Sequence, residues 1–211
     1  NRRCYQSMGY CDTGDRICIE GAPTLAMFKK TVIGMFDPAN VTLPMIYQVE
    51  KYELQECLDV IHQSFCTIAK QFGLTRENCP KHTSFIPLAS LETQMNQDWY
   101  MYALYAGKKI IGYMSLSKEG DNTYELHNLA VLPEYQHNGF GKLLLNYAKD
   151  TVKALGGNTI KIGIIEENTV LKNWYIANEF VHIGTMKFDH LPFTCGYLEW
   201  KADKFPGCIG V

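Results

Sequence analysis

The sequence lacks several features that mark particular classes of protein. Its stretch LAMFKKTVIGMF is interrupted by Lys29 and Lys30 and is too short to cross a bilayer, and no signal-peptide pattern is visible. Neither sign of charge dominates, since 20 basic and 22 acidic residues give a net charge of −2. No polybasic field is therefore available for nucleic acid. We expect a cytoplasmic protein whose main partner is neither a membrane nor a nucleic acid.

The sequence also lacks a C-x-x-C pair, although it contains eight cysteines. Cys57 and Cys66 lie inside the apolar patterns LQECLDVI and SFCTI, which favours buried reduced thiols over a disulfide framework. Cys4, Cys11 and Cys18 have the spacing C-x6-C-x6-C, which is not a usual zinc spacing, and no fourth ligand is evident nearby. We therefore expect no bound metal.

What the sequence does have is enough apolar material for a packed domain, 46% of its 211 residues. We assign residues 1–44 to an N-terminal extension, 45–203 to the main domain and 204–211 to a C-terminal tail. In the extension, the apolar residues between Pro23 and Phe36 fit one face of a helix, and DPAN supplies its stop. The extension packs on the main domain or on a second subunit, and the second alternative would make the protein a homodimer.

The main domain alternates between strand and helix patterns. Turn residues in AGKK and KEGDN join three consecutive strands into an antiparallel meander, and TRENCPKHTSF is expected to be a loop. The order of elements predicts an α/β fold of the α+β type, a mixed and mostly antiparallel sheet flanked by helices. The expected strands are Met45–Val49, Trp99–Ala106, Lys109–Leu116, Thr123–Val131, Thr159–Ile165, Phe180–Met186 and Thr194–Trp200, and the expected helices are Glu53–Phe65, Thr67–Phe72, one that begins at the glycines 139 and 141, and Asn168–Asn178.

The stretch QHNGFGKLLLNYAKD places two glycines directly before a helical run of leucines. Gly139 and Gly141 remove Cβ atoms where the first, unpaired N–H groups and the helix dipole favour an anion, most often phosphate. A P-loop is excluded because Gln136 and Leu143 stand where that motif has glycine and Ser or Thr, and Leu144 replaces the third glycine of the dinucleotide fingerprint. At this point it stays open that the glycines only turn the chain.

The segment LHNLAVLPEYQHNGFGKLLL resembles the acyl-CoA-binding signature of the GNAT superfamily of N-acetyltransferases, whose loop is written R/Q-x-x-G-x-G/A. A second stretch, ENTVLKNWYIANEF, is similar to the family's later motif, in which an Asn opens a helix and a Tyr stands five residues before a Phe. Gln136 replaces the commoner Arg, and Glu179 stands where a Gly often precedes the Phe. The resemblance covers roughly Met45 to Lys201 and leaves out the first 44 residues.

The resemblance implies a GNAT fold with a splayed central strand pair and acetyl-CoA as co-substrate. A β-bulge near Leu129 to Val131 would part this strand from Thr159–Ile165 and free its backbone for the pantetheine amides. Without the resemblance, LAV would count as ordinary strand core. The cofactor-binding residues that it implies are Leu129, Ala130, Val131, Gln136, His137, Asn138, Gly139, Phe140, Gly141, Lys142 and Asn168.

Acetyl transfer to a primary amine needs a proton acceptor, a stabilised oxyanion and a proton for the leaving thiolate. Glu125 stands where related histone-type acetyltransferases carry their base. His127 shares its strand face and competes with it, water is a further alternative, and Glu125 could equally be a solvated cross-strand partner. By resemblance, Tyr175 is the general acid that protonates the sulfur of CoA. The backbone N–H of Val131 is the expected oxyanion donor.

The acceptor is not specified by the sequence. The segment TRENCPKHTSFIPLASLETQMNQDW, which should shape the acceptor site, mixes charges of both signs with aromatic residues. Small amines, polyamines, amino acids and protein N-termini all stay open as acceptors. The alternative to an enzyme is a non-catalytic acyl-CoA-binding sensor or interaction module, because fold and cofactor binding do not by themselves establish catalysis.

Overall fold

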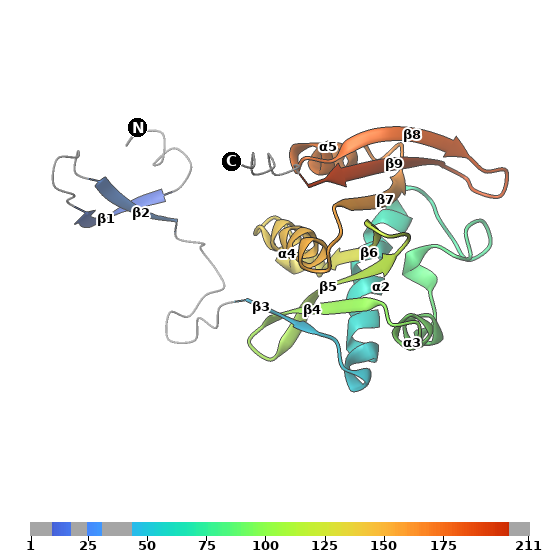
Figure 1. Cartoon of the computed structure of the whole chain (residues 1–211), viewed down its shortest axis with the longest axis horizontal. Coiled ribbons are helices and arrows are strands. Elements are labelled where there is room, and N and C mark those ends of the chain that lie inside the picture. The colour runs from blue at the N-terminus through green and yellow to red at the C-terminus, as the bar shows by residue number, and fades with distance from the viewer. Residues whose placement is uncertain (1–9, 18–24, 31–43, 203–211) are drawn as a thin grey trace, which may run out of the picture. The chain divides into compact units, whose positions relative to one another are not determined.

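The computed structural model describes residues 10–17, 25–30 and 44–202. The chain divides into two compact units, Asn1–Thr42 and Leu43–Val211, and every helix of the described residues belongs to the second (Figure 1). The C-terminal tail at 204–211 lies outside the described residues, and the domain boundaries given above stay predictions.

The first unit contains a β-hairpin where the sequence pattern predicted a helix. Strand β1 (Tyr10–Ile17) pairs antiparallel with strand β2 (Leu25–Lys30). The predicted helix over Pro23–Phe36 is therefore wrong across Leu25–Lys30, and its other residues lie outside the described part. A stretch of only six residues, such as LAMFKK, fits the helix period and the strand period almost equally well. Backbone pairing with β1 decides between them, and no pattern within β2 encodes that pairing.

The second unit is built on a seven-stranded sheet with the strand order β3-β4-β5-β6-β7-β9-β8. All neighbours are antiparallel except β6 and β7, which are parallel and are connected through helix α4 (Phe140–Ala154). The predicted mixed sheet and its antiparallel meander, β4 to β6, are confirmed. The strands are β3 (Met45–Gln48), β4 (Tyr100–Ala106), β5 (Lys109–Lys118), β6 (Thr123–Val131), β7 (Thr159–Ile165), β8 (Val181–Lys187) and β9 (Thr194–Lys201).

Helices cover both faces of this sheet. Figure 1 shows α4 on one side of β5 and β6, and α2 (Leu54–Gln71) and α3 (Leu88–Asn96) on the other. Helix α5 (Thr169–Ala177) lies against α4, since Gly141 faces the ring of Trp174. On the α4 side the packing is tight, because a Cβ atom at Gly112 of β5 would meet Leu144 Cδ1 at 2.9 Å. Because helices cover both of its faces, β5 is buried from residue 110 to residue 117.

Two helical segments differ from the sequence prediction. Helix α2 is continuous where two pieces were expected, and at the join Thr67 turns its hydroxyl back to the carbonyl of Ser64, 2.7 Å away. This bond satisfies the hydroxyl without interrupting the helix. The 3-10 turn η3 (Thr83–Phe85) and α3 lie in a segment for which no helix was predicted. In α3 only Leu91 is buried, so no apolar stripe marks this helix in the sequence.

Among the cysteines whose side chains the structure describes, Cys57, Cys66, Cys79 and Cys195 are free thiols. Cys57 and Cys79 are buried, whereas Cys66 and Cys195 are half-buried. The prediction of a buried thiol is therefore confirmed at Cys57 and only partly met at Cys66. Burial on the core-facing side of α2, followed by the charges of Glu53 and Glu56, raises the pKa of Cys57 to about 12. This thiol stays protonated at neutral pH and packs as a small apolar group.

Candidate active site

The sheet is split between its two parallel strands. Strands β6 and β7 pair only through Thr123, Tyr124 and Glu125, which face residues 159–161. Both strands continue for several residues beyond this point without pairing to each other. The splayed central pair that the family resemblance implied is thus present, and it opens at the carboxyl ends of both strands.

A β-bulge in β6 lies at the start of this split. Tyr113 of β5 pairs with Ala130 and Ser115 pairs with His127, so Asn128 and Leu129 together oppose one residue. Asn128 takes a positive φ of 52°, a conformation that asparagine tolerates better than most residues. The bulge predicted for this part of the strand is confirmed, one residue earlier than its predicted start.

The backbone of Val131 turns its N–H toward the split. Leu132 donates to the carbonyl of Ile111 across the β5 edge, at 2.9 Å. Hydrogen-bonding groups alternate between the two edges of a strand, so Val131 directs its own groups to the β7 side. Its carbonyl accepts a bond from Gln136 Nε2 at 3.0 Å, which ties the following loop to the strand. Gln136, predicted to touch the cofactor, thus holds the loop in place through one of its amide hydrogens.

The loop after β6 ends in a helix start that no side chain caps. Gly139 is the N-cap of α4 with φ 84° and ψ −2°, in the left-handed region, and α4 has no side-chain cap bond. His137 also has a positive φ of 63°, and Asn138 turns its amide back to the carbonyls of Tyr135 and Gln136. Because no Cβ fills the space beside Gly139, the free N–H groups of the first turn face an open cradle. Such a cradle suits a phosphate group.

Tyr175 lies on α5, and its neighbour Trp174 contacts Gly141 in the first turn of α4. The side chain of Tyr175 is 6% exposed, and its ring meets those of Trp174 and Phe180 edge-on, with centroids 4.9 and 5.3 Å away. Burial raises the pKa of its phenol, so the hydroxyl keeps its proton at neutral pH. Asn168, also predicted to bind the cofactor, uses its side-chain oxygen to cap α5 by accepting from Leu171 N at 3.1 Å.

Glu125 and His127 project from the same face of β6, where a polar network has formed. His127 Nε2 lies 2.9 Å from Ser117 Oγ, and this hydroxyl donates to Glu119 Oε1, also at 2.9 Å. Because Ser117 has a single hydroxyl proton, His127 must supply the hydrogen of the first bond from Nε2. Its other nitrogen then carries the lone pair. Glu125 Oε2 lies 3.9 Å from His127 Nε2.

The environment shifts the acidity of both candidate bases. Burial raises the pKa of Glu125, the charge of Glu119 adds to this, and Lys161 opposes it. A raised pKa makes this carboxylate a better proton acceptor at neutral pH than an ordinary glutamate. His127 is packed against the ring of Trp99, 4.5 Å away between centroids, and burial lowers its pKa to about 4. His127 is therefore neutral at physiological pH.

We expect the low pKa of His127 to make the protein sensitive to acid. The histidine binds its proton near pH 6.5 when the chain is unfolded and near pH 4 when it is folded. As the pH falls between these values the unfolded state binds more protons, so stability is lost. The loss is roughly 2 kcal/mol at pH 5. In His127→Gln, the fall in unfolding free energy between pH 7 and pH 5, measured in urea, should shrink by this amount.

The exposed His190 provides the control for this measurement. His190→Gln should keep the full acid sensitivity, because this side chain is exposed and takes no part in the buried contacts of His127. An acid sensitivity unchanged by His127→Gln would show that His127 is not held neutral in the folded protein.

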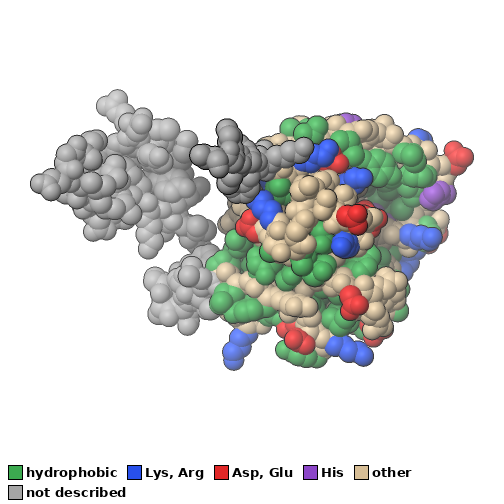
Figure 2. Space-filling view, viewed as in Figure 1, with side chains coloured by type: hydrophobic (Ala, Val, Ile, Leu, Met, Phe, Trp, Pro, Cys, Tyr) green, Lys and Arg blue, Asp and Glu red, His purple; other side chains and the backbone are tan. Residues whose placement is uncertain are grey.

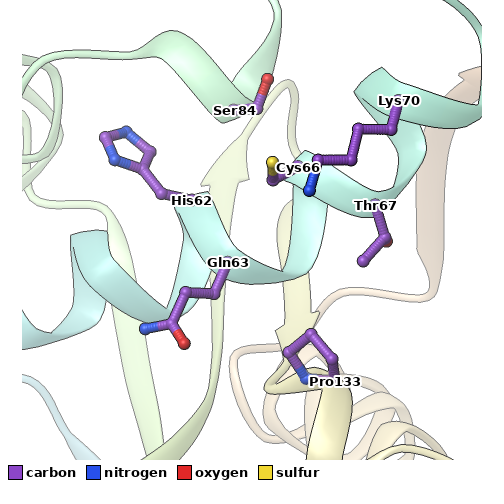
Figure 3. Close-up of a pocket in the computed structure, with 7 residues that line it drawn as sticks. All are labelled: His62, Gln63, Cys66, Thr67, Lys70, Ser84 and Pro133. Atoms are coloured by element: carbon purple, nitrogen blue, oxygen red, sulfur yellow. The ribbon is translucent and has the colours of Figure 1, made fainter.

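A separate hollow of about 460 Å³ lies along the outer face of α2. Figure 3 shows its lining, in which one row of α2 side chains meets η3 and the segment that follows β6. The hollow approaches the candidate site at Pro133, which lies two residues after the end of β6. None of the residues predicted to act on acetyl-CoA or the amine lines the hollow, whose lining residues are His62, Gln63, Cys66, Thr67, Lys70, Ser84 and Pro133.

Charged side chains, and side chains of the types that bind metals, are not clustered in the described part of the second unit. Figure 2 shows acidic and basic side chains interspersed over one face of the molecule, without a large patch of one sign. In the described residues, no three His, Cys, Asp or Glu side chains are grouped so that they could hold a metal ion. None of the described helices is long and apolar enough to span a membrane.

Sequence reasoning missed several residues of this site. Ser117 lies in β5, Glu119 follows that strand and Trp99 precedes β4, and the pairing of the strands brings them to Glu125 and His127. Residues 115, 117 and 119 alternate with 116 and 118, so the sequence SLSKE could have predicted that Ser117 lies on the same face of the sheet as Glu125, which pairs with it. The segment that predicted the glycine cradle, by contrast, is continuous in the sequence.

Comparison with known proteins agrees with this geometry. A sequence model of the acetyltransferase (GNAT) family matches residues 68–180, more than half of the 211-residue chain. The chain belongs to this family. It is thereby an enzyme of the GNAT N-acetyltransferase type, and the matched segment includes the β6 bulge, the glycine cradle and Tyr175.

Two bacterial N-acetyltransferases are among its relatives in sequence. An uncharacterized N-acetyltransferase from the pepI 3′ region of Lactobacillus delbrueckii subsp. lactis is 24% identical over 168 residues, which cover 72% of this chain and 89% of the relative. YvbK, an uncharacterized N-acetyltransferase of Bacillus subtilis strain 168, is 40% identical over 62 residues, 29% of this chain and 40% of its own length. The chain thus matches less than half of YvbK.

Solved GNAT structures share the fold. The ribosomal-protein-S18-alanine N-acetyltransferase of Escherichia coli superposes with a TM-score of 0.63 at 13% identity, over 80% of this chain and 100% of that one. The PaiA N-acetyltransferase of Thermoplasma acidophilum, solved in complex with coenzyme A, gives a TM-score of 0.59 at 21% identity, with 76% and 100% covered. The predicted fold is therefore confirmed.

Proposed function

We propose that this GNAT protein transfers the acetyl group of acetyl-CoA to a primary amine. The observations that carry the proposal are the split between β6 and β7, the uncapped start of α4, and the packing of α5, the helix that bears Tyr175, against that start through Trp174. The split supplies backbone groups for the pantetheine arm and the helix start supplies N–H groups for the pyrophosphate. Solved relatives that hold coenzyme A support this choice of cofactor.

The cofactor-binding residues keep the roles expected for them, with two adjustments. Leu129, Ala130 and Val131 offer backbone groups along the split, and the Val131 N–H is the oxyanion donor. The cradle from His137 to Lys142 holds the pyrophosphate through backbone N–H groups. Gln136 and Asn168 act indirectly, because their side chains bind the protein's own backbone.

In the proposed reaction, each proton has a named carrier. Glu125 takes the proton of the ammonium group, and the free amine then attacks the acetyl carbonyl carbon. The carbon–sulfur bond breaks, and Tyr175 gives its phenolic proton to the departing sulfur. The attacking nitrogen still carries one proton more than the amide product, and this proton passes to the Tyr175 phenolate and restores the phenol. His127 is the competing base. Its neutral ring has a free lone pair, but a pKa of about 4 makes it the weaker proton acceptor.

We expect Glu125→Gln to lower kcat/KM by roughly 10²-fold at neutral pH. The loss should shrink as the pH rises toward the pKa of the amine, because a free amine needs no base. A pH profile of acetyl transfer from pH 6 to pH 10 measures this. The same profile for His127→Gln decides between the two candidates, since only the true base shows a loss that shrinks at high pH.

Glu199→Gln is the matched control. Glu199 lies in the same row of the sheet, opposite Lys161, which in turn faces Glu125. It is already paired with Lys201 at 2.6 Å, and its replacement should leave the pH profile unchanged. A loss in Glu125→Gln that does not vary with pH would contradict the role of Glu125 as base.

A screen of amines with detection of free thiol tests the proposed activity. The panel needs small amines, polyamines, amino acids and peptides with free N-termini, because no described feature selects among these acceptors. Calorimetry with acetyl-CoA is run in parallel. Tight binding without turnover on any amine would contradict the transfer reaction and favour an acyl-CoA sensor. Absence of both would contradict the cofactor assignment.

A further inference from the structure

A buried lysine connects the proposed cofactor helix to the helix that carries Tyr175. Lys149 lies on α4, and its side chain is 9% exposed. Its ammonium group donates to the carbonyl of Asn178, the C-cap residue of α5, at 2.8 Å. It also donates to Glu179 Oε2 at 2.8 Å. One cation of α4 therefore holds the C-terminal end of α5.

The surroundings of Lys149 fit this use of its charge. A buried ammonium group loses its hydration and persists only with good partners. Here the partners include the rings of Phe180 and Trp200, 5.7 and 5.2 Å from the nitrogen. The C-terminus of a helix is also where the helix dipole favours a positive charge. Asn178 closes the same helix end by donating from its amide to the carbonyl of Trp174 at 2.7 Å.

Different contacts hold the other end of α5. Lys172 pairs with Glu166, which follows β7, and this carboxylate also binds His182 of β8 at 3.0 Å. These contacts fix the start of α5 to the sheet. Lys149 alone among these cations comes from α4, whose first turn bears the proposed pyrophosphate cradle (Figure 1).

We propose that Lys149 is a positioning residue that sets the place of the Tyr175 hydroxyl relative to acetyl-CoA. Helix α5 has nine residues and is too short to be stable by itself, so outside contacts must define its position. A shift of about 1 Å between reacting groups can cost roughly 10²-fold in rate. The proposal rests on the proposed function of Tyr175 and adds the group that fixes its distance from the sulfur.

A double-mutant cycle in kcat tests the proposal. Lys149→Met keeps an apolar stem of similar length and removes the donors. We expect it to lower kcat by about tenfold, a partial misplacement, while acetyl-CoA affinity measured by calorimetry stays within about threefold. In the Tyr175→Phe background the same change should lower kcat by less than about twofold, since the proton donor is already lost. Lys149→Arg, which keeps the cation, should retain most of the wild-type kcat.

Lys153→Met is the matched control, because Lys153 lies on the same helix, 5.5 Å from the same Trp200 ring, with its side chain 52% exposed. It should leave kcat unchanged. Equal losses in both backgrounds, or an unchanged kcat in Lys149→Met, would overturn the positioning role. If Lys149→Met does not fold, the cycle is run with Lys149→Gln, which keeps a neutral donor for the Asn178 carbonyl. An unchanged kcat in Tyr175→Phe alone would overturn the acid assignment and this proposal together, whereas the amine screen tests acetyl transfer separately.

Discussion

Gly139→Val should abolish measurable binding of acetyl-CoA while the protein stays folded. At Gly139 the backbone has a φ of 84°, and a Cβ atom there would meet nothing within 4 Å. The open space is the one that a phosphate oxygen would enter, and a branched side chain would fill it. A valine in the left-handed region costs roughly 1–3 kcal/mol, which a packed domain of this size can bear. Calorimetry with acetyl-CoA and circular dichroism measure the two effects.

Gly156→Val is the control that separates strain from lost contacts. Gly156 follows the other end of α4, with a φ of 79° and equally open surroundings. Its replacement by valine carries a similar conformational cost, so it should lower stability by a similar amount and leave acetyl-CoA binding intact. Equal affinity in Gly139→Val and Gly156→Val would exclude the phosphate cradle.

The parts of the fold that could be predicted are those encoded locally. Each strand of the meander is a short run rich in aliphatic and aromatic residues, and the turns between them carry glycine or asparagine, so β4, β5 and β6 follow from short stretches of sequence. Helix α4 has a strong apolar stripe and a glycine start. The hairpin of β1 and β2 could not be derived in this way, because the two strands stabilise each other by backbone pairing and neither has a distinctive period.

The residues of the candidate site also fall into those encoded in one continuous stretch of sequence and those brought together by strand pairing. Gly139, Gly141 and Tyr175 belong to continuous motifs, and the family resemblance led to them directly. Ser117 and Glu119 join the site through the register of β5 against β6, which one strand's pattern does not fix.

The position of Lys149 in the sequence indicates that its side chain is buried and needs a partner. It stands four residues after Leu145 and three before Val152, both buried, so a charged residue occupies the apolar face of α4. A lysine in such a position needs a partner, because burial of an unpaired charge is costly. The partner is the carbonyl of Asn178 at the end of α5, and strand β7 lies between α4 and α5 in the sequence. The need was therefore visible in the sequence, whereas the identity of the partner was not.

Tyr175→Phe should lower kcat by roughly 10²-fold and leave the affinity for acetyl-CoA almost unchanged. The proposed role of the hydroxyl is confined to the step in which the thiolate departs, so its loss does not weaken the ground state. A thiol with a pKa of about 8.5 leaves tolerably well even without a proton donor, so the reaction slows but does not stop. The phenylalanine ring keeps the edge-on contacts with Trp174 and Phe180, and stability should change little.

Tyr113→Phe provides the comparison. Tyr113 is another buried tyrosine of the same domain, and its hydroxyl has no hydrogen-bond partner among the described residues. Removal of this hydroxyl should leave kcat unchanged and stability equal or higher, because a buried hydroxyl without a partner costs free energy. Steady-state kinetics on an amine from the screen then separate the two tyrosines. If both variants turned over at the wild-type rate, Tyr175 would be a packing residue, and the departing thiolate would take its proton from water.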